Sequence, residues 1–178
     1  MKRKSYNCPN HAHFLTFSCY RHQKLLDPDD AKRILTETWN EVRRKGDFLI
    51  WAYVIMPEHV HLLIYPNDHN YQISRILRLL KEPFTHGIVR HWKDLDSPAL
   101  ERILVIRGGR ILHRFWQEGG GFDRNLYSWD RINKAIDYIE WNPVRRGLAS
   151  DPLGWKWSSA RSRDGIKNVS LIVDDIHL

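Results

Sequence analysis

Two histidines that flank a valine are the residues of this chain best suited to bind a metal ion. In His59-Val60-His61, alternation along a β-strand would send both imidazoles to one face and Val60 to the other. Two nitrogen ligands could then converge on one ion and leave positions open for a substrate. Imidazoles alone also suit zinc, whereas Mg²⁺ or Mn²⁺ is suited to polarising a phosphate oxygen. The alternative is a pair of histidines on a solvated strand face.

A tyrosine and an asparagine form the second candidate group. Tyr138 and Asn142 would lie about one turn apart on the same face of a helix, if the helix persists that far. A tyrosine can attack a phosphodiester and hold the 5′ phosphate as an ester, and an amide oxygen is a hard ligand that completes the shell of a cation. Pro143 biases Asn142 away from helical geometry. The alternative for Tyr138 is a core or interface tyrosine.

Two other metal or nucleophile patterns fit the sequence less well. The histidine-triad nucleotide hydrolases require a third histidine on the same strand, where this chain has Leu63. Cys8, His11 and His13 lie close together, but no fourth ligand is nearby in the sequence. Neither pattern replaces the pair His59 and His61.

The charge of the chain favours a polyanionic partner. A net charge of +7 and a pI near 9.5 fit nucleic acid, although a generically basic protein is the alternative. The cations predicted to contact phosphates are Arg75, Arg78, Lys81, Arg145 and Arg146. The tryptophans considered for stacking on unpaired bases are Trp116, Trp129 and Trp141.

The first half of the chain predicts strands and one helix that would position the histidines. β-favouring runs predict strands over 11–19, 48–56 and 59–65, the last two joined by a turn at Pro57-Glu58. Between the first two runs, Asp27 is the expected N-cap of a helix with Pro28 at its first position. Gly46 is the expected stop of that helix.

The second half predicts two further helices and a strand. Apolar residues from Ile73 to Phe84 indicate an amphipathic helix, which Pro83 is expected to kink or end. The glycine-rich stretch 93–121 is expected to be loop-rich. A strand over 122–127 and a helix capped by Ser128 follow, and Pro143 and Gly147 are expected to end this helix.

The predicted order β, α, β, β, α, β, α is that of an α+β, ferredoxin-like (split β-α-β) fold. Such a fold is an antiparallel sheet, here expected with its helices on one face. We expect one domain over 1–178, with the polar C-terminal tail from Ser158 in a covering role. No apolar run is long enough to span a bilayer, and two cysteines fit a reducing compartment, so a cytoplasmic protein is expected.

Two motifs together resemble those of the REP-associated tyrosine transposases, relatives of the insertion-sequence single-tyrosine transposases of the HUH type. The first is Met56-Pro57-Glu58-His59-Val60-His61, and the second runs from Asp137 to Leu148. A later Trp155-Lys156-Trp157-Ser158-Ser159 also looks like the family, so the resemblance covers roughly residues 12 to 160. Each motif alone is weakly specific, whereas their order and spacing together are specific.

The resemblance implies roles for the candidate residues. It implies that His59, His61 and Asn142 hold Mg²⁺ or Mn²⁺ and that Tyr138 is the nucleophile forming a 5′-phosphotyrosine link. The wider transposase group also implies a homodimer, with Tyr138 acting in its own chain or across the dimer.

The expected function is therefore that of a metal-dependent endonuclease and strand transferase acting on hairpin-flanked single-stranded DNA. Many REP-associated members carry a Gly-Arg-containing stretch near the N-terminus, whereas this chain has only Lys2-Arg3-Lys4 and Arg21. That difference leaves open whether the hairpin is a REP-like palindrome. The alternative function is a non-catalytic, domesticated protein that binds single-stranded DNA hairpins.

Overall fold

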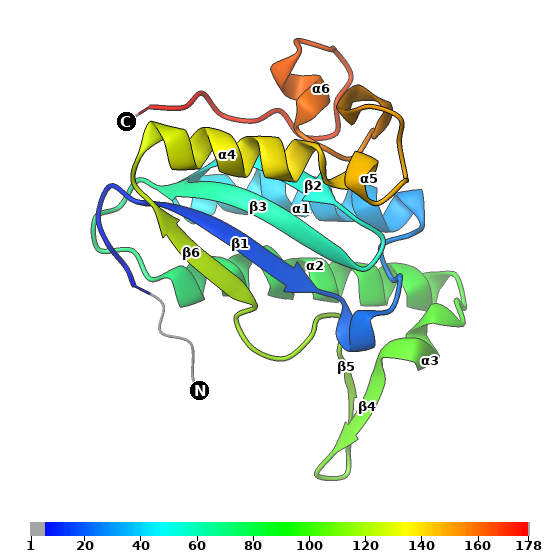
Figure 1. The fold of residues 1–178 in the computed structure, drawn as a ribbon. Coiled ribbons are helices and arrows are strands. Elements are labelled where there is room, and N and C mark those ends of the chain that lie inside the picture. The colour runs from blue at the N-terminus through cyan, green and yellow to red at the C-terminus, as the bar shows by residue number, and fades with distance from the viewer. Residues whose placement is uncertain (1–5, 178) are drawn as a thin grey trace.

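The computed structural model describes residues 6–177, so the basic residues Lys2, Arg3 and Lys4 lie outside the described residues. The strands are β1 (Ala12–Ser18), β2 (Phe48–Ile55), β3 (His59–Pro66), β4 (Leu104–Arg107), β5 (Arg110–His113) and β6 (Phe122–Leu126) (Figure 1). The α-helices are α1 (Asp29–Lys45), α2 (Ile73–Asp94), α3 (Ala99–Ile103), α4 (Trp129–Glu140), α5 (Asn142–Arg145) and α6 (Ala160–Arg163). The short 3-10 turns are η1 (Tyr20–His22) and η2 (Pro152–Gly154).

Four strands form the central sheet, in the order β2-β3-β1-β6. Every neighbouring pair is antiparallel, and β1 lies between β3 and β6. Helices α1 and α2 make the two crossovers, as in the split β-α-β arrangement. The predicted α+β, ferredoxin-like class is confirmed.

Helices cover both faces of the sheet, so the expectation of helices on one face is wrong. One core layer packs α1 and α2 against side chains such as Leu15 and Tyr53. A second layer packs Ile136 and Ile139 of α4 against Val54 on the other face. Figure 1 shows α4 and α2 on opposite sides of the sheet. The continuous apolar run of β2 is the cause, because a strand buried on both faces needs a cover on each side.

Helix α2 continues through Pro83 to Asp94, so the expectation that Pro83 ends it is wrong. A proline inside a helix removes one backbone hydrogen bond at a cost of about 3 kcal/mol. Beyond Pro83 the buried stripe goes on with Phe84, Ile88 and Trp92, which pack into the core. Burial of three large side chains, each contributing about 1.5–3 kcal/mol, outweighs the loss.

Helix α1 begins at Asp29, with Pro28 at the N-cap position, so the expected cap at Asp27 is displaced by one residue. Asp29 accepts hydrogen bonds from Trp157 Nε1 at 2.9 Å and Lys156 Nζ at 3.0 Å. These bonds tie the start of α1 to the C-terminal segment. The predicted stop at Gly46 is confirmed.

The stretch 93–121 is more regular than the loop expected from its glycines. It holds the end of α2, the helix α3 and a two-stranded hairpin of β4 and β5 that projects from the sheet (Figure 1). Gly108 and Gly109 form its turn with φ values of 57° and 74°, which glycine adopts without strain. Four-residue strands are too short for periodicity to reveal them, which explains the error.

The C-terminal segment covers β2, as expected. Ser158 forms a β-bridge with Val54, and Asp174 accepts a hydrogen bond from the backbone of Ile50 at 2.8 Å. Leu171 is buried in the core. Among the described residues, no helix is both long and apolar enough to span a bilayer.

Candidate active site

The two histidines of β3 converge on one point, as alternation along the strand predicts. His59 Nε2 and His61 Nε2 lie 3.1 Å apart, and the two rings meet edge to face with centroids 4.7 Å apart. Val60 points to the opposite face and belongs to the core under α1 and α2. The imidazoles are therefore on the α4 side of the sheet.

Burial favours the neutral form of both imidazoles. It lowers the pKa of His61 to about 3, and the neighbouring His59 adds to the effect. Burial also lowers the pKa of His59, against the opposing charge of Glu58. A neutral imidazole has the free lone pair that a metal ligand needs, so the pair is prepared for a cation at neutral pH.

Hydrogen bonds fix the far side of each ring. Thr16 Oγ1 lies 2.7 Å from His61 Nδ1, across the pairing of β1 with β3. Glu58 Oε1 lies 3.2 Å from His59 Nδ1 and accepts a bond from Arg146 Nη2 at 2.8 Å. Such contacts orient the two rings so that both Nε2 atoms point to the same place, where a cation could be held.

Asn142 reaches the histidines from a second helix. Helix α4 ends at Glu140, and Asn142 begins the short helix α5, so Pro143 lies inside α5 and does not end a helix, contrary to expectation. Gly147 follows α5 with a φ of 67°. The break at Trp141 turns Asn142 into the protein, where its Nδ2 lies 3.2 Å from His61 Nε2.

The same amide of Asn142 carries a buried carbonyl oxygen without a partner. Asn142 Oδ1 has no hydrogen-bond partner in the described part of the chain. Leaving a buried acceptor unpaired costs about 1–3 kcal/mol, and a cation bound beside the histidines would offset that cost. Two neutral imidazoles and one amide oxygen suit a divalent cation that keeps open positions for phosphate. The residues present thus fit the expected ion.

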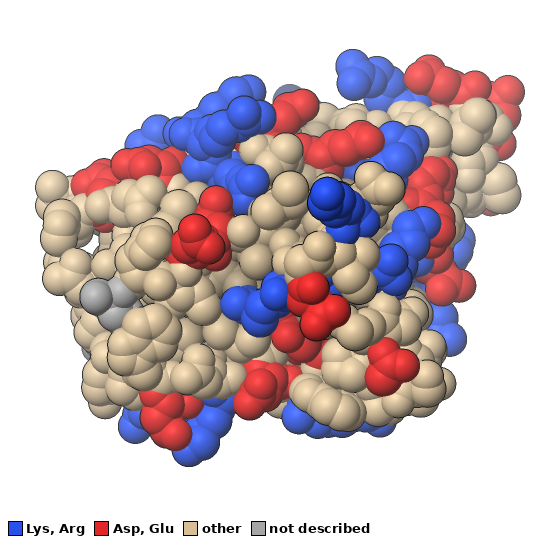
Figure 2. Space-filling view, turned by 90° about the horizontal axis from the view of Figure 1, so that it is seen from above, with Lys and Arg blue, Asp and Glu red and all other residues tan. Residues whose placement is uncertain are grey.

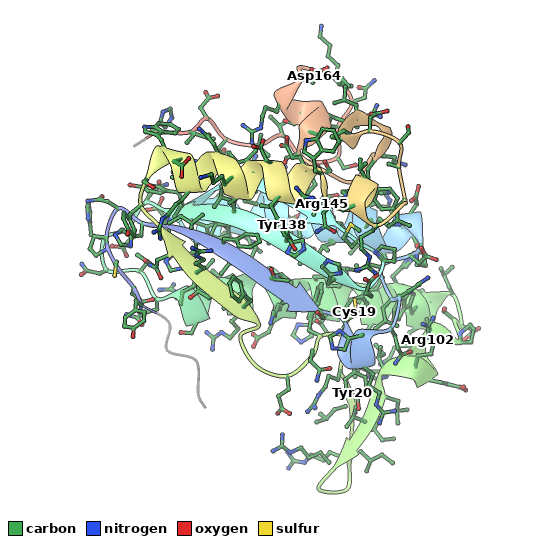
Figure 3. The ribbon with its side chains drawn as sticks, viewed as in Figure 1. Cys19, Tyr20, Arg102, Tyr138, Arg145 and Asp164 are labelled. Carbon is green, nitrogen blue, oxygen red and sulfur yellow. The ribbon has the colours of Figure 1, made fainter. Side chains whose placement is uncertain are left out.

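Tyr138 stands at the edge of this cluster with its side chain 43% exposed. Its ring centroid lies 5.3 Å from that of His61 and 5.8 Å from that of Phe14. Arg145 donates to the Tyr138 backbone carbonyl at 3.0 Å and places its guanidinium 5.1 Å from the ring centroid (Figure 3). The phenol is both fixed and open to solvent, as a nucleophile must be.

The five cations predicted to contact DNA lie in two separate places. Arg145 and Arg146 border the site and contact Tyr138 and Glu58. Arg75, Arg78 and Lys81 lie on α2, which covers the other face of the sheet. Figure 2 shows that on the α4 side basic and acidic side chains are mixed, with no continuous basic surface.

Lys81 differs from the other cations of α2. Burial lowers its pKa to about 8, and its ammonium donates to the Gly119 carbonyl at 3.1 Å above the Phe17 ring. Arg75 and Arg78 are exposed, and Arg78 approaches Glu82 at 3.8 Å. The two arginines are therefore the freer phosphate contacts of this helix.

The tryptophans considered for base stacking also differ. Trp116 is buried and packs edge to face on Phe17, so it belongs to the core. Trp129 and Trp141, at the two ends of α4, are 49% and 46% exposed. Of the three tryptophans considered, Trp129 and Trp141 are available to a base.

The alternative metal group at the N-terminus is not formed. His13 is fully buried and bonds Asp123 Oδ1 through Nδ1 at 2.7 Å and the Tyr71 hydroxyl through Nε2 at 2.6 Å. Both of its nitrogens are therefore engaged. No cluster of three or more His, Cys, Asp or Glu side chains suited to a metal occurs among residues 6–177.

A family model described as "Transposase IS200 like" matches residues 5–102, more than half of the chain. The chain belongs to the IS200-like transposase family. The matched range includes His59 and His61 and ends before Tyr138.

Two proteins that are similar to this chain carry a narrower name. A Haemophilus influenzae protein assigned by name to the REP-associated tyrosine transposases is 29% identical over 140 residues, 74% of this chain and 73% of its own. The REP-associated tyrosine transposase of Escherichia coli is 26% identical over 121 residues, 67% of this chain and 58% of its own. The resemblance inferred from the two motifs is confirmed.

A solved structure shares the fold of this transposase. It is a REP-associated tyrosine transposase bound to a REP hairpin, with a TM-score of 0.69 and 22% identity. The match covers 99% of this chain and 92% of the other. At this identity it establishes the common fold.

Sequence reasoning missed several residues around the site. Thr16, Glu58 and Phe14 contact the candidate residues through strand pairing or a turn. Glu58 stood inside the first motif and could have been selected on its position beside His59. No sequence pattern around Thr16 or Phe14 predicts their contacts, because the register of β1 on β3 decides which residues lie next to them.

Proposed function

We propose that this transposase is a metal-dependent endonuclease and strand transferase that acts on hairpin-flanked single-stranded DNA through a 5′-phosphotyrosine intermediate. The observation that supports this most is the position of Tyr138, whose ring lies beside His61 in the cluster of neutral imidazoles. A nucleophile and a ligand group for a divalent ion at one place are what tyrosine-mediated strand transfer needs.

His59, His61 and Asn142 would hold Mg²⁺ or Mn²⁺. Bound there, the ion would polarise the scissile phosphate and stabilise the charge that develops on its oxygens. The unpaired Oδ1 of Asn142 supports its inclusion as a ligand.

In the first step, the Tyr138 phenol loses its proton to water and its Oη attacks the phosphorus. The bond from phosphorus to the 3′ oxygen breaks, and that oxygen takes up a proton to leave a free 3′ hydroxyl. The 5′ part of the cut remains on Tyr138 as a phosphotyrosine. In the second step a 3′ hydroxyl attacks this phosphorus, the phenol leaves and is protonated again, and the strands are joined without external energy.

Arg145 and Phe14 would hold the nucleophile during these steps. Their contacts fix the backbone carbonyl and the ring of Tyr138 while leaving the hydroxyl open. Holding reacting groups in place is a large part of catalysis in such transfers.

A suicide oligonucleotide, nicked so that the released strand diffuses away, tests the proposal. Wild type with Mg²⁺ or Mn²⁺ should accumulate a protein–DNA adduct that survives denaturing electrophoresis, and His61→Ala should not. Both proteins should bind the DNA to a similar extent. Binding without any adduct in wild type would favour the non-catalytic hairpin-binding alternative.

A further inference from the structure

A pocket opens directly beside Tyr138, between α4 and the strands β1 and β6. Its volume is about 310 Å³. Its apolar surface comes from Phe14, Leu126 and Ala135, one from each element, and Tyr138 forms one wall. A volume at the lower end of the usual range for small-ligand sites suits one nucleotide and is too small for a base pair.

The charged residues at this pocket are all cations. Arg124 extends from β6, and Arg131 and Lys134 extend from α4, whereas no carboxylate lines the pocket. Lys134 is paired with Asp130 at 2.8 Å, and Arg131 lies over the Tyr127 ring at 5.2 Å. Arg124 forms no salt bridge within the described residues, so it is the cation most free to bind a phosphate.

We infer that this pocket binds one unpaired nucleotide of the DNA strand that crosses Tyr138. The base packs on Phe14, Leu126 and Ala135, while a neighbouring phosphate is held by Arg124 and Arg131. Aromatic and apolar contacts accept any base face, so the pocket positions the strand without reading its sequence. The inference rests on the proposed function, because it assigns the pocket to the same strand that Tyr138 attacks.

The geometry favours a strand over a free mononucleotide. Tyr138 lines the pocket, so a nucleotide held inside it lies beside the phenol and brings an adjoining phosphodiester close to it. Because only one nucleotide separates the pocket from the reacting phosphorus, binding in the pocket restricts where that phosphorus can lie relative to the Tyr138 hydroxyl. A free mononucleotide has no phosphodiester that Tyr138 could attack.

Binding experiments in the Tyr138→Phe background test the pocket without any chemistry. The probe is a fluorescein-labelled 12-nucleotide thymidine strand, compared at fixed ionic strength with an abasic strand of the same length. Arg124→Ala should raise the Kd for the thymidine strand about tenfold, which corresponds to about 1.4 kcal/mol. The matched control is Arg33→Ala, an exposed arginine paired with Glu37 on α1, and it should leave the Kd unchanged.

The second measurement uses a variant whose pocket is filled by a larger side chain. Ala135→Leu places three more carbons at the apolar surface, so the preference for thymidine over the abasic strand should fall to near one. A change in that ratio reports base contact and not phosphate contact, following the logic of a double-mutant cycle. Thermal unfolding of each variant checks the fold, and if Ala135→Leu unfolds, Arg131→Ala takes its place with an expected rise in Kd like that of Arg124→Ala.

Three results would overturn the inference. Equal Kd values for Arg124→Ala and Arg33→Ala would show that Arg124 does not bind a phosphate of the strand. If the ratio of the Kd values for the thymidine and abasic strands is unchanged in a folded Ala135→Leu variant, no base packs in the pocket. Displacement of the 12-mer by thymidine monophosphate at the Kd of the strand itself would show a mononucleotide site.

The pocket and the proposed function fail in different ways. If wild type forms no tyrosyl adduct while Arg124→Ala still weakens binding, the proposed chemistry is wrong and the nucleotide pocket stands. If the adduct forms on Tyr138 while Arg124→Ala binds and reacts as wild type does, the chemistry stands and the pocket assignment is wrong.

Discussion

The side-chain amide nitrogen of Asn142 lies 3.2 Å from Nε2 of His61, although 81 positions separate the two residues in the chain. This contact joins α5 to the middle of the sheet and leaves Asn142 Oδ1 buried without a partner in the described structure. The histidine pair and the tyrosine helix are thereby brought into one site.

Replacement of Asn142 should change the affinity for metal more than the fold. Asn142→Ala deletes the third proposed ligand and should weaken Mn²⁺ binding by at least about tenfold in calorimetric titration. Asn142→Asp keeps an oxygen in place and adds charge, so it should bind Mn²⁺ at least as tightly as wild type. If all three proteins bind Mn²⁺ equally, Asn142 is not a ligand.

Thr16 should act through His61, because its hydroxyl lies 2.7 Å from Nδ1 of that ring. Thr16→Val has nearly the same shape without the hydroxyl, and should reduce Mn²⁺ affinity about 10- to 100-fold as the imidazole loses its orientation. Thr16→Ser restores the hydroxyl and should recover most of the affinity. A Thr16→Val variant that binds Mn²⁺ as tightly as wild type would make this hydrogen bond purely structural.

Stability should fall with acid because His61 is held neutral. Its pKa is about 3 in the folded chain, against about 6.5 for an unperturbed histidine. Between these values the unfolded chain binds a proton that the folded chain excludes, so the free energy of unfolding falls as pH falls, by at most about 1.4 kcal/mol per pH unit for this group. His61→Gln should lower that slope in metal-free urea unfolding. Identical slopes for the two proteins would contradict the burial of a neutral His61.

Salt should weaken DNA binding, and Arg145 and Arg146 should account for part of the effect. For a single strand each phosphate contact contributes about 0.7 to the slope of log K against log salt. Arg145→Ala together with Arg146→Ala should therefore lower the slope by up to about 1.4. Arg75→Ala with Arg78→Ala is the comparison on the other face of the sheet, and reports whether DNA also contacts α2. If the affinity for DNA does not change with salt, base stacking and not phosphate contact is the main source of that affinity.

Local pattern was enough to predict the histidines, because alternation on one strand decides where His59 and His61 point. It was also enough for the fold class, since the element order β, α, β, β, α, β is typical of the ferredoxin-like arrangement. The position of α4 was missed, because the face that a final helix covers depends on burial across the whole sheet and not on the helix itself.

Contacts decided by distant pairing could not be predicted. The nearness of Thr16 to His61 depends on the register of two strands, and Arg124 lines the same pocket as Tyr138 only because β6 pairs with β1 beside α4. The kink that turns Asn142 inward was only hinted at by Pro143. Each of these requires tertiary structure, where a shift of one residue would move every side chain to the other face.

Peptide mapping of the covalent adduct tests the central claim most directly. Wild type incubated with Mg²⁺ and labelled single-stranded substrate should carry the DNA on the peptide that contains Tyr138, and Tyr138→Phe should form no adduct while still binding the strand. Tyr127 is exposed just before α4, and its ring is tilted against that of His11 with centroids 5.2 Å apart. It is the nearest competing tyrosine in the sequence, and Tyr127→Phe should keep the adduct. DNA found on Tyr127, or an adduct that persists in Tyr138→Phe, would contradict the account.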